Sequence, residues 1–175
     1  MKPLFLIGYM GCGKTSFGRK LAKRLGMQFL DTDRMVEEAE GAVMTDIFQY
    51  EGELHFRKTE RAMLQQILAT GTDKVISTGG GLPTWQDNMT LMNQAGRTIY
   101  LKRTAEQIAK RLTPYGRHRR PKLRNLEGDE LLEFMTRDMA EREVFYNRAQ
   151  IIANCKSQSD EMLLEWILEK LGTSE

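Results

Sequence analysis

Short apolar runs alternate along the chain with stretches of helical periodicity. Five runs have the length and composition of buried strands, over residues 4–7, 27–30, 74–78, 97–101 and 149–153. Parallel strands need long crossover connections, and helices usually supply them. The alternation therefore predicts an α/β fold, with a five-stranded parallel sheet flanked by helices on both faces.

Helical patterns fill the intervals between these runs. The predicted helices are one ending at Gly26, one beginning near Arg34, one over 51–69, one after Pro83, one opening at Thr104 and ending before Pro114, one over 129–149 and one over 160–171. Leu54 is predicted on the buried stripe of the helix over 51–69, and Met162 in the core face of the last helix. Thr104 and Gln107 have the form of a capping box.

The bulk properties limit the kind of protein. A chain of 175 residues with 41% hydrophobic residues suits one compact domain, 1–175. The formal net charge of +2 implies neither a nucleic-acid partner nor a membrane surface. Cys12 and Cys155 lack metal-like or redox-like spacing, and no apolar stretch approaches membrane-spanning length. We expect a cytoplasmic, soluble monomer with reduced thiols.

The segment from Gly8 to Thr15 reads Gly-Tyr-Met-Gly-Cys-Gly-Lys-Thr and fits G-x-x-x-x-G-K-[ST]. It follows an apolar run and precedes a helical pattern, which is the context of a phosphate-binding loop (P-loop). Backbone N–H groups and the helix N-terminus would face the phosphates, a lysine would reach the β/γ-phosphates, and a hydroxyl would bind Mg²⁺. The predicted nucleotide-binding residues here are Gly11, Cys12, Gly13, Lys14, Thr15 and Ser16.

Two acids, Asp31 and Asp33, follow the second run. Residues two apart on a strand face the same side, so both carboxylates are expected to project from the strand's carboxyl end. Ligands bind at that end of open α/β sheets. One interpretation is a site for Mg²⁺ or a hydroxyl group; the alternative is that one aspartate caps the helix beginning near Arg34.

Two further features suggest an acceptor site. Residues 79–81 are three glycines directly after the third run, either a flexible turn or a floor without side chains beneath a small substrate. Arg57 lies on a helical stripe, where it could bind an anion or pair with Glu53 or Glu60. No acid ends the third run, so Asp31 would have to serve Mg²⁺.

The most basic stretch, residues 115–124, has no core periodicity. It is either a solvated charge run, a surface for nucleic acid, or a mobile lid, over about 112–125, that brings an arginine to the transferring phosphate. The P-loop favours the lid. Phosphoryl transfer needs positioning and charge neutralisation, which a P-loop, strand-end carboxylates and arginines can supply.

Over nearly its whole length the sequence resembles the shikimate kinase family. The resemblance rests on the P-loop together with Leu30-Asp31-Thr32-Asp33, Gly52-Glu53-x-x-Phe56-Arg57-x-x-Glu60, Gly79-Gly80-Gly81, Arg120-Pro121 and Arg142-x-x-x-Tyr146. It implies a P-loop kinase fold and transfer of the ATP γ-phosphoryl group to the 3-hydroxyl of shikimate, a step of aromatic amino-acid synthesis. ATP and shikimate are the implied partners, and Mg²⁺ the implied cofactor.

The resemblance also assigns roles to residues on the acceptor side. Asp33 would hold and activate the acceptor hydroxyl, and Arg57 and Arg142 would bind the carboxylate of shikimate. Glycines would shape the pocket, namely Gly79, Gly80 and Gly81.

On the donor side, the resemblance implies that Lys14 and Arg120 neutralise phosphoryl charge. Thr15, and Asp31 through water, would serve Mg²⁺. Arg111 and the loop near Asn154 would contact adenine. The family usually continues Arg-Pro with two leucine-like residues, whereas Lys122 and Leu123 follow here, so Arg117 and Arg119 remain alternatives to Arg120.

Two rival functions remain open. A related small-metabolite kinase, such as one acting on gluconate, would share the P-loop and the fold. A nucleotide-gated switch of the small GTPase kind would need the guanine-reading N-K-x-D, and the chain has no such tetrapeptide.

Overall fold

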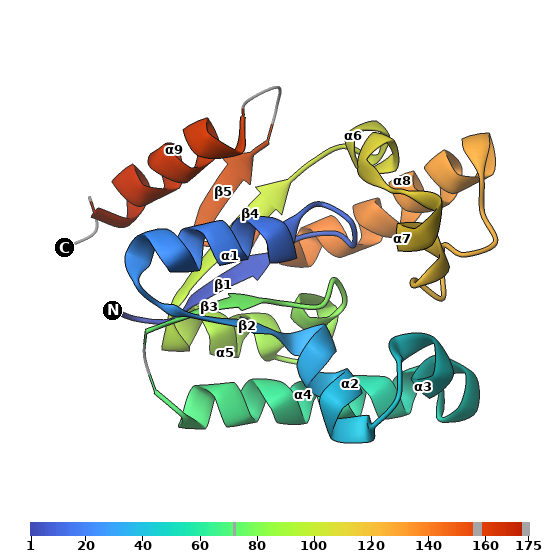
Figure 1. Ribbon diagram of the computed structural model, residues 1–175, viewed down its shortest axis with the longest axis horizontal. Coiled ribbons are helices and arrows are strands. Elements are labelled where there is room, and N and C mark those ends of the chain that lie inside the picture. Colours follow the sequence, from blue (N-terminus) through green and yellow to red (C-terminus); the bar gives the residue numbers. More distant parts are fainter. Residues whose placement is uncertain (72, 156–158, 173–175) are drawn as a thin grey trace.

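The computed structural model describes residues 1–71, 73–155 and 159–172. Within them, five parallel strands form one sheet in the order β2-β3-β1-β4-β5 (Figure 1). The strands are β1 (Leu4–Ile7), β2 (Gln28–Asp31), β3 (Lys74–Ser77), β4 (Arg97–Lys102) and β5 (Ile151–Asn154). Leu4 of the central β1 pairs with Val75 on one side and Arg97 on the other. The predicted five-stranded parallel sheet is confirmed.

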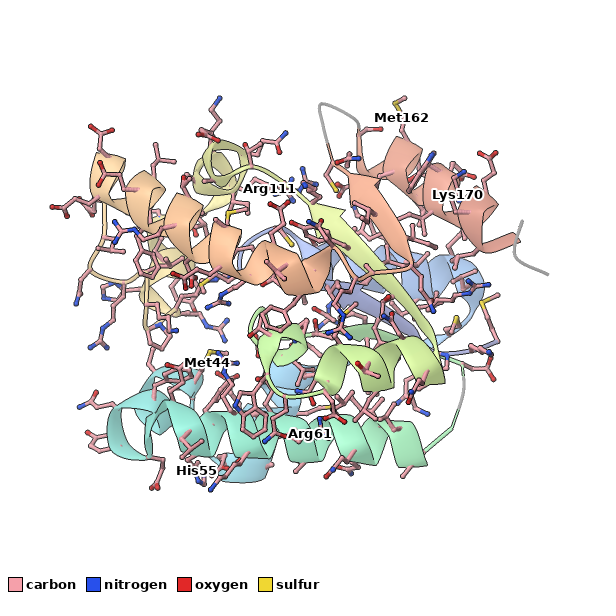
Figure 2. All side chains as sticks on the ribbon, turned by 180° about the vertical axis from the view of Figure 1, so that it is seen from behind. Met44, His55, Arg61, Arg111, Met162 and Lys170 are labelled. Carbon is pink, nitrogen blue, oxygen red and sulfur yellow. The ribbon has the colours of Figure 1, made fainter. Side chains whose placement is uncertain are left out.

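Helices cover both faces of the sheet. They are α1 (Lys14–Leu25), α2 (Thr32–Glu40), α3 (Met44–Tyr50), α4 (Gly52–Ala69), the 3₁₀ helix η1 (Leu82–Thr84), α5 (Asn88–Ala95), α6 (Ala105–Arg111), α7 (Pro114–His118), α8 (Gly128–Tyr146) and α9 (Asp160–Gly172). In Figure 1 α1 lies in front of the sheet, and Figure 2, from behind, shows α5 and α8 over the other face. Every residue of β1 is fully buried between these layers.

The carboxyl ends of the strands face the side of the molecule on which α3 and α7 lie (Figure 1). The loops after β1, β2 and β3 therefore meet at one edge, where α/β proteins bind ligands. The predicted capping box is present at the start of α6, since Thr104 Oγ1 accepts a hydrogen bond from Gln107 N and Gln107 Oε1 accepts one from Thr104 N.

The placement of the two strand-end acids differs from the prediction. Strand β2 ends at Asp31, and Asp33 lies in the first turn of α2 rather than on the strand. Asp31 ends the strand because its Oδ1 accepts hydrogen bonds from Asp33 N and Arg34 N, at 3.1 and 3.4 Å. A carboxylate at this N-cap position stabilises the first turn of a helix, so α2 begins directly after Asp31.

Two other sequence predictions are wrong in detail, and one helix was missed. Leu54 is 61% exposed because the buried face of α4 runs through Phe56, Leu64 and Ile67, and Leu54 lies outside this face. Met162 is 61% exposed and projects from α9 (Figure 2). The helix α3 was not predicted at all, because only Ile47 in it is fully buried and its apolar pattern is weak.

The basic segment is more ordered than a plain loop. It contains α7, whose Thr113 caps the helix by accepting a hydrogen bond from Gly116 N, and Leu123 is fully buried in the core. None of the described helices is both long and apolar enough to span a membrane.

Candidate functional site

The loop between β1 and α1 is folded as a phosphate cradle. Gly8, Gly11 and Gly13 have φ angles of 146°, 80° and 98°, a region that residues with a side chain rarely adopt. The buried Lys14 donates hydrogen bonds from Nζ to the carbonyls of Gly8 and Tyr9, at 2.8 and 3.0 Å. These bonds hold the ammonium group inside the turn of the loop.

The other predicted nucleotide-binding residues divide into two groups. Ser16 and Arg111 line the same cavity as the loop, and a Cβ at Gly13 would lie 3.0 Å from Arg111 Nη2. Cys12 is buried beneath the loop. Among the described residues, Asn154 at the end of β5 does not line this cavity, and residues 156–158 of the loop after it lie outside the described residues.

Thr15 and Asp31 meet at the start of α1. Thr15 Oγ1 donates a hydrogen bond of 2.7 Å to Asp31 Oδ2, and Ser77 Oγ lies 3.4 Å away. These hard oxygen donors, beside a phosphate cradle, suit Mg²⁺, which keeps several waters and takes few protein ligands. No group of three or more acidic, histidine or cysteine side chains among the described residues is arranged to hold a metal, so phosphate oxygens and water would have to complete the shell.

Asp33 is a partly buried carboxylate that lines the cavity. Burial, and then the charge of Asp31, raise its pKa to about 6, while Lys14 and Arg57 oppose the shift. A carboxylate with this pKa is largely ionised at neutral pH yet a better base than an exposed aspartate.

Arg57 and Glu60 form an ion pair on α4. Arg57 Nη1 donates to Glu60 Oε2 at 2.6 Å, and Arg57 Nη2 lies 3.4 Å from Glu53 Oε1. Glu60 is fully buried, and its Oε1 accepts no hydrogen bond from the described residues. Burial raises the pKa of Glu60 to about 7, against the attraction of Arg57. Arg57 therefore both pairs with acids and lines the cavity.

The three glycines let these charged groups approach one another. A Cβ on Gly79 would lie 2.5 Å from Asp33 Oδ1, and one on Gly81 would collide with the guanidinium group of Arg57. A Cβ on Gly80 would lie 3.4 Å from Arg142 Nη1. A side chain at Gly79 or Gly81 would displace the acid or the arginine, so the absence of side chains in this segment is what lets both groups approach it.

Arg142 reaches the cavity from α8. It is 8% exposed, and its Nε donates to Asp138 Oδ1 at 3.2 Å. Its guanidinium carbon lies 5.4 Å from the ring centroid of Tyr9. The arginine is held by α8 on one side and by the P-loop on the other.

One cavity of about 910 Å³ is lined by Lys14, Thr15, Asp31, Asp33, Arg57, Glu60, Gly80, Gly81 and Arg142. Gly79 is not among its lining residues. Apolar side chains from α3 and α4, Met44, Phe48 and Phe56, line the wall opposite the basic segment. Figure 2 shows Met44 and Arg111 on opposite sides of this region. The volume is sufficient for a small anionic acceptor beside a nucleotide.

The arginines of the basic segment point in different directions. Arg119 and Arg120 line the cavity, and burial lowers the pKa of Arg120 although Asp33 attracts its charge. Arg117 instead donates to the Leu126 carbonyl at 3.2 Å, and its Nη2 lies 3.5 Å from Glu127.

This arrangement agrees with comparisons to known proteins. The sequence model of the family described as shikimate kinase matches residues 10–172. The chain belongs to the shikimate kinase family. A curated shikimate kinase from Azobacteroides pseudotrichonymphae is 40% identical over 171 residues, which cover 98% of this chain and all of that protein.

Solved shikimate kinases share the fold. The enzyme from Bacteroides thetaiotaomicron superposes with a TM-score of 0.89 at 35% identity, covering 98% of both chains. That from Acinetobacter baumannii, solved in complex with shikimate, gives 0.85 at 32% identity, covering 100% of this chain and 95% of that one. A gluconokinase from Sinorhizobium meliloti, at 16% identity and 0.53, is similar in fold alone. The P-loop kinase fold is confirmed.

Some residues of this shikimate kinase cavity gave no clear signal in the sequence. Met44 and Phe48 lie on the unpredicted α3. Glu60 was foreseen only as one possible partner of Arg57, and its full burial with a free Oε1 was not expected. The available signal was the position of Glu60 on the apolar face of a helix. A polar residue that is buried there usually has a specific hydrogen-bonding partner.

The raised pKa of Glu60 predicts how stability depends on pH. A folded-state pKa of about 7 exceeds the ordinary 4.5, so the folded state binds the proton more tightly. The contribution of Glu60 is then fully present below the ordinary pKa and is lost as pH rises through about 7. The parental protein should therefore gain free energy of unfolding relative to Glu60→Gln when pH is lowered from about 8 to about 5.

Urea unfolding of both proteins at the two pH values measures this difference. Other titrating groups are common to both proteins and largely cancel. A difference that stays constant, or that shrinks at low pH, would mean that Arg57 keeps Glu60 ionised.

Proposed function

We propose that this member of the shikimate kinase family transfers the γ-phosphoryl group of ATP to the 3-hydroxyl of shikimate, a step of aromatic amino-acid synthesis. The observation that carries the proposal is that Asp33, Arg57 and Arg142 line the same cavity as the P-loop. An acid beside two arginines suits an acceptor with both a hydroxyl and a carboxylate. The shikimate-bound relative from Acinetobacter baumannii supports the choice of acceptor.

The residue roles follow from these positions. Asp33 accepts the proton of the attacking hydroxyl, and Arg57 and Arg142 bind the acceptor carboxylate over the glycine floor, Gly79, Gly80 and Gly81. Asp33 Oδ1 and Arg57 Nη2 both approach this floor, so one small molecule lying on it can contact both.

On the donor side, the P-loop binds the phosphates, and Lys14 neutralises the charge that develops on the transferred group. Mg²⁺ supplies further charge neutralisation when bound; Thr15 would hold it, with Asp31 acting through water. Arg111 and the region of Asn154 contact the adenine end of ATP. The protein acts as a cytoplasmic monomer with a single domain, 1–175.

The acceptor identity can be tested by ADP release with ATP, Mg²⁺ and a panel of shikimate, gluconate and nucleoside monophosphates. We expect kcat/KM for shikimate to exceed that for each other acceptor by at least about 100-fold. Gluconate shares the carboxylate, so the preference would come from a cavity shaped for the ring acid that the relative from Acinetobacter baumannii binds. Comparable or faster turnover with gluconate would overturn the assignment.

The segment over about 112–125, which contains the basic stretch, is proposed as the lid, with Arg120 as its phosphate-binding arginine. Arg120 lines the cavity, whereas Arg117 pairs with Glu127. Arg120→Ala should therefore lower kcat by about 100-fold, and Arg117→Ala by less than about threefold. Steady-state kinetics of the two matched variants measure the difference, and a larger loss for Arg117→Ala would reverse the assignment.

A further inference from the structure

Tyr9 is a P-loop residue whose side chain leaves the phosphate cradle and reaches α8. The residue is 1% exposed, and its hydroxyl donates a hydrogen bond of 2.7 Å to Asp138 Oδ2. The P-loop motif specifies no residue type at this position. The bond spans 129 residues of sequence, so it joins two parts of the fold that only tertiary structure brings together.

Asp138 connects this tyrosine to Arg142. The second oxygen of its carboxylate, Oδ1, accepts a hydrogen bond from Arg142 Nε. The guanidinium group also lies over the Tyr9 ring, a favourable contact for a cation when water is excluded. Asp138 thus holds Arg142 by a hydrogen bond at Nε, and the Tyr9 ring packs against the face of its guanidinium group.

Only part of the guanidinium group is taken up by this fixation. Arginine binds a carboxylate through a planar fork of N–H groups, and the strength of the pair depends on the fork's orientation. Asp138 accepts from Nε and Tyr146 also interacts with the guanidinium group, while Nη1 of Arg142 approaches Gly80 at the cavity. Burial and the bond to Asp138 hold the pKa of Tyr9 above its ordinary value, so its hydroxyl remains a donor.

The backbone of Tyr9 contacts the other substrate's site. Its carbonyl accepts hydrogen bonds from Lys14 Nζ at 3.0 Å and from Cys12 N at 3.2 Å. One residue therefore contacts both the lysine assigned to the transferred phosphate and, through its side chain, the arginine assigned to the acceptor.

We propose that the Tyr9–Asp138 pair positions Arg142 for the acceptor carboxylate, and so sets the affinity for an anionic acceptor from within the P-loop. This inference rests on the proposed function, because it takes shikimate as the acceptor. Neither residue contacts the reacting atoms; both act through Arg142.

Tyr9→Phe removes only the hydroxyl, and Asp138→Asn removes the charge at nearly constant shape. Each should raise KM for shikimate by about five- to tenfold, the cost of a lost charge-assisted hydrogen bond. kcat and KM for ATP should stay within about twofold of the parental values. Glu133→Gln, an exposed acid on the same helix, is the matched control and should leave all three unchanged.

The decisive arm places Tyr9→Phe in an Arg142→Ala background. If Tyr9 acts through Arg142, Tyr9→Phe should no longer lower kcat/KM for shikimate in this background. The inference fails if Tyr9→Phe lowers kcat/KM for shikimate by the same factor in the Arg142→Ala background as in the parental protein. It also fails if KM for shikimate is unchanged in both single variants, or if kcat and both KM values change together with a lower Tm. Parental turnover with shikimate, measured alongside, tests the proposed function separately.

Discussion

Asp33→Asn should lower kcat for shikimate phosphorylation by about 10²–10⁴-fold, the range that general bases contribute. Asparagine keeps the size of the side chain but cannot accept the hydroxyl proton. Asp33 is partly buried beside the glycine floor, and its raised pKa of about 6 suits it to this task. Because it does not belong to the phosphate cradle, KM for ATP should change by less than about twofold.

Asp46→Asn is the matched control, because Asp46 also lies in the first turn of a helix but is exposed. Steady-state kinetics of both variants test the role of Asp33. An Asp33→Asn enzyme with near-parental kcat would show that another group accepts the proton; Asp31 and Glu60, which also line the cavity, would be the candidates.

Lys14→Ala should have the second largest effect, lowering kcat by about 10²–10³-fold. Its ammonium group is held at the P-loop by two carbonyls, so the lost charge acts on the transferring phosphate and not on the acceptor. KM for shikimate should therefore change much less than kcat.

Lys23→Ala, at an exposed lysine of the same helix, controls for the loss of a positive charge on α1. Single-turnover measurements with both variants separate chemistry from product release. A defect confined to KM for shikimate would place Lys14 on the acceptor side and contradict its assigned role.

The sequence predicts the framework of this fold well because local signals define it. Apolar runs marked all five strands, and the capping box at Thr104 marked the start of α6. The strand order could not be read in this way, since it depends on which crossovers pack together. Leu54 and Met162 were wrongly predicted to be buried. Periodicity identifies the apolar stripe of a helix, but it does not show which residues at the border of that stripe the rest of the fold covers.

The candidate site was predictable where a motif fixes the backbone. The P-loop glycines adopt the conformations that the motif requires. Asp31 and Asp33 were expected side by side on a strand, but the N-cap bonds of Asp31 start the helix between them. The two interpretations of Asp31 were not exclusive, because the same carboxylate caps α2 and contacts Thr15.

Side-chain direction was the least predictable property. Arg117 and Arg120 lie three residues apart in one basic segment, yet only Arg120 of these two lines the cavity. The difference arises from Glu127 and Leu126, whose positions depend on how the segment folds back on itself. The Tyr9–Asp138 bond likewise has no sequence signature, because it depends on the docking of α8 against the P-loop.

Phosphorus NMR of the reaction product tests the central claim most directly. The purified protein is incubated with ATP, Mg²⁺ and shikimate, and the position of the new phosphate ester is read from its coupling to the ring protons. We predict one product, phosphorylated at the 3-hydroxyl, formed in equal amount to ADP. ADP formed without any phosphorylated shikimate, or an ester at another hydroxyl, would contradict the account.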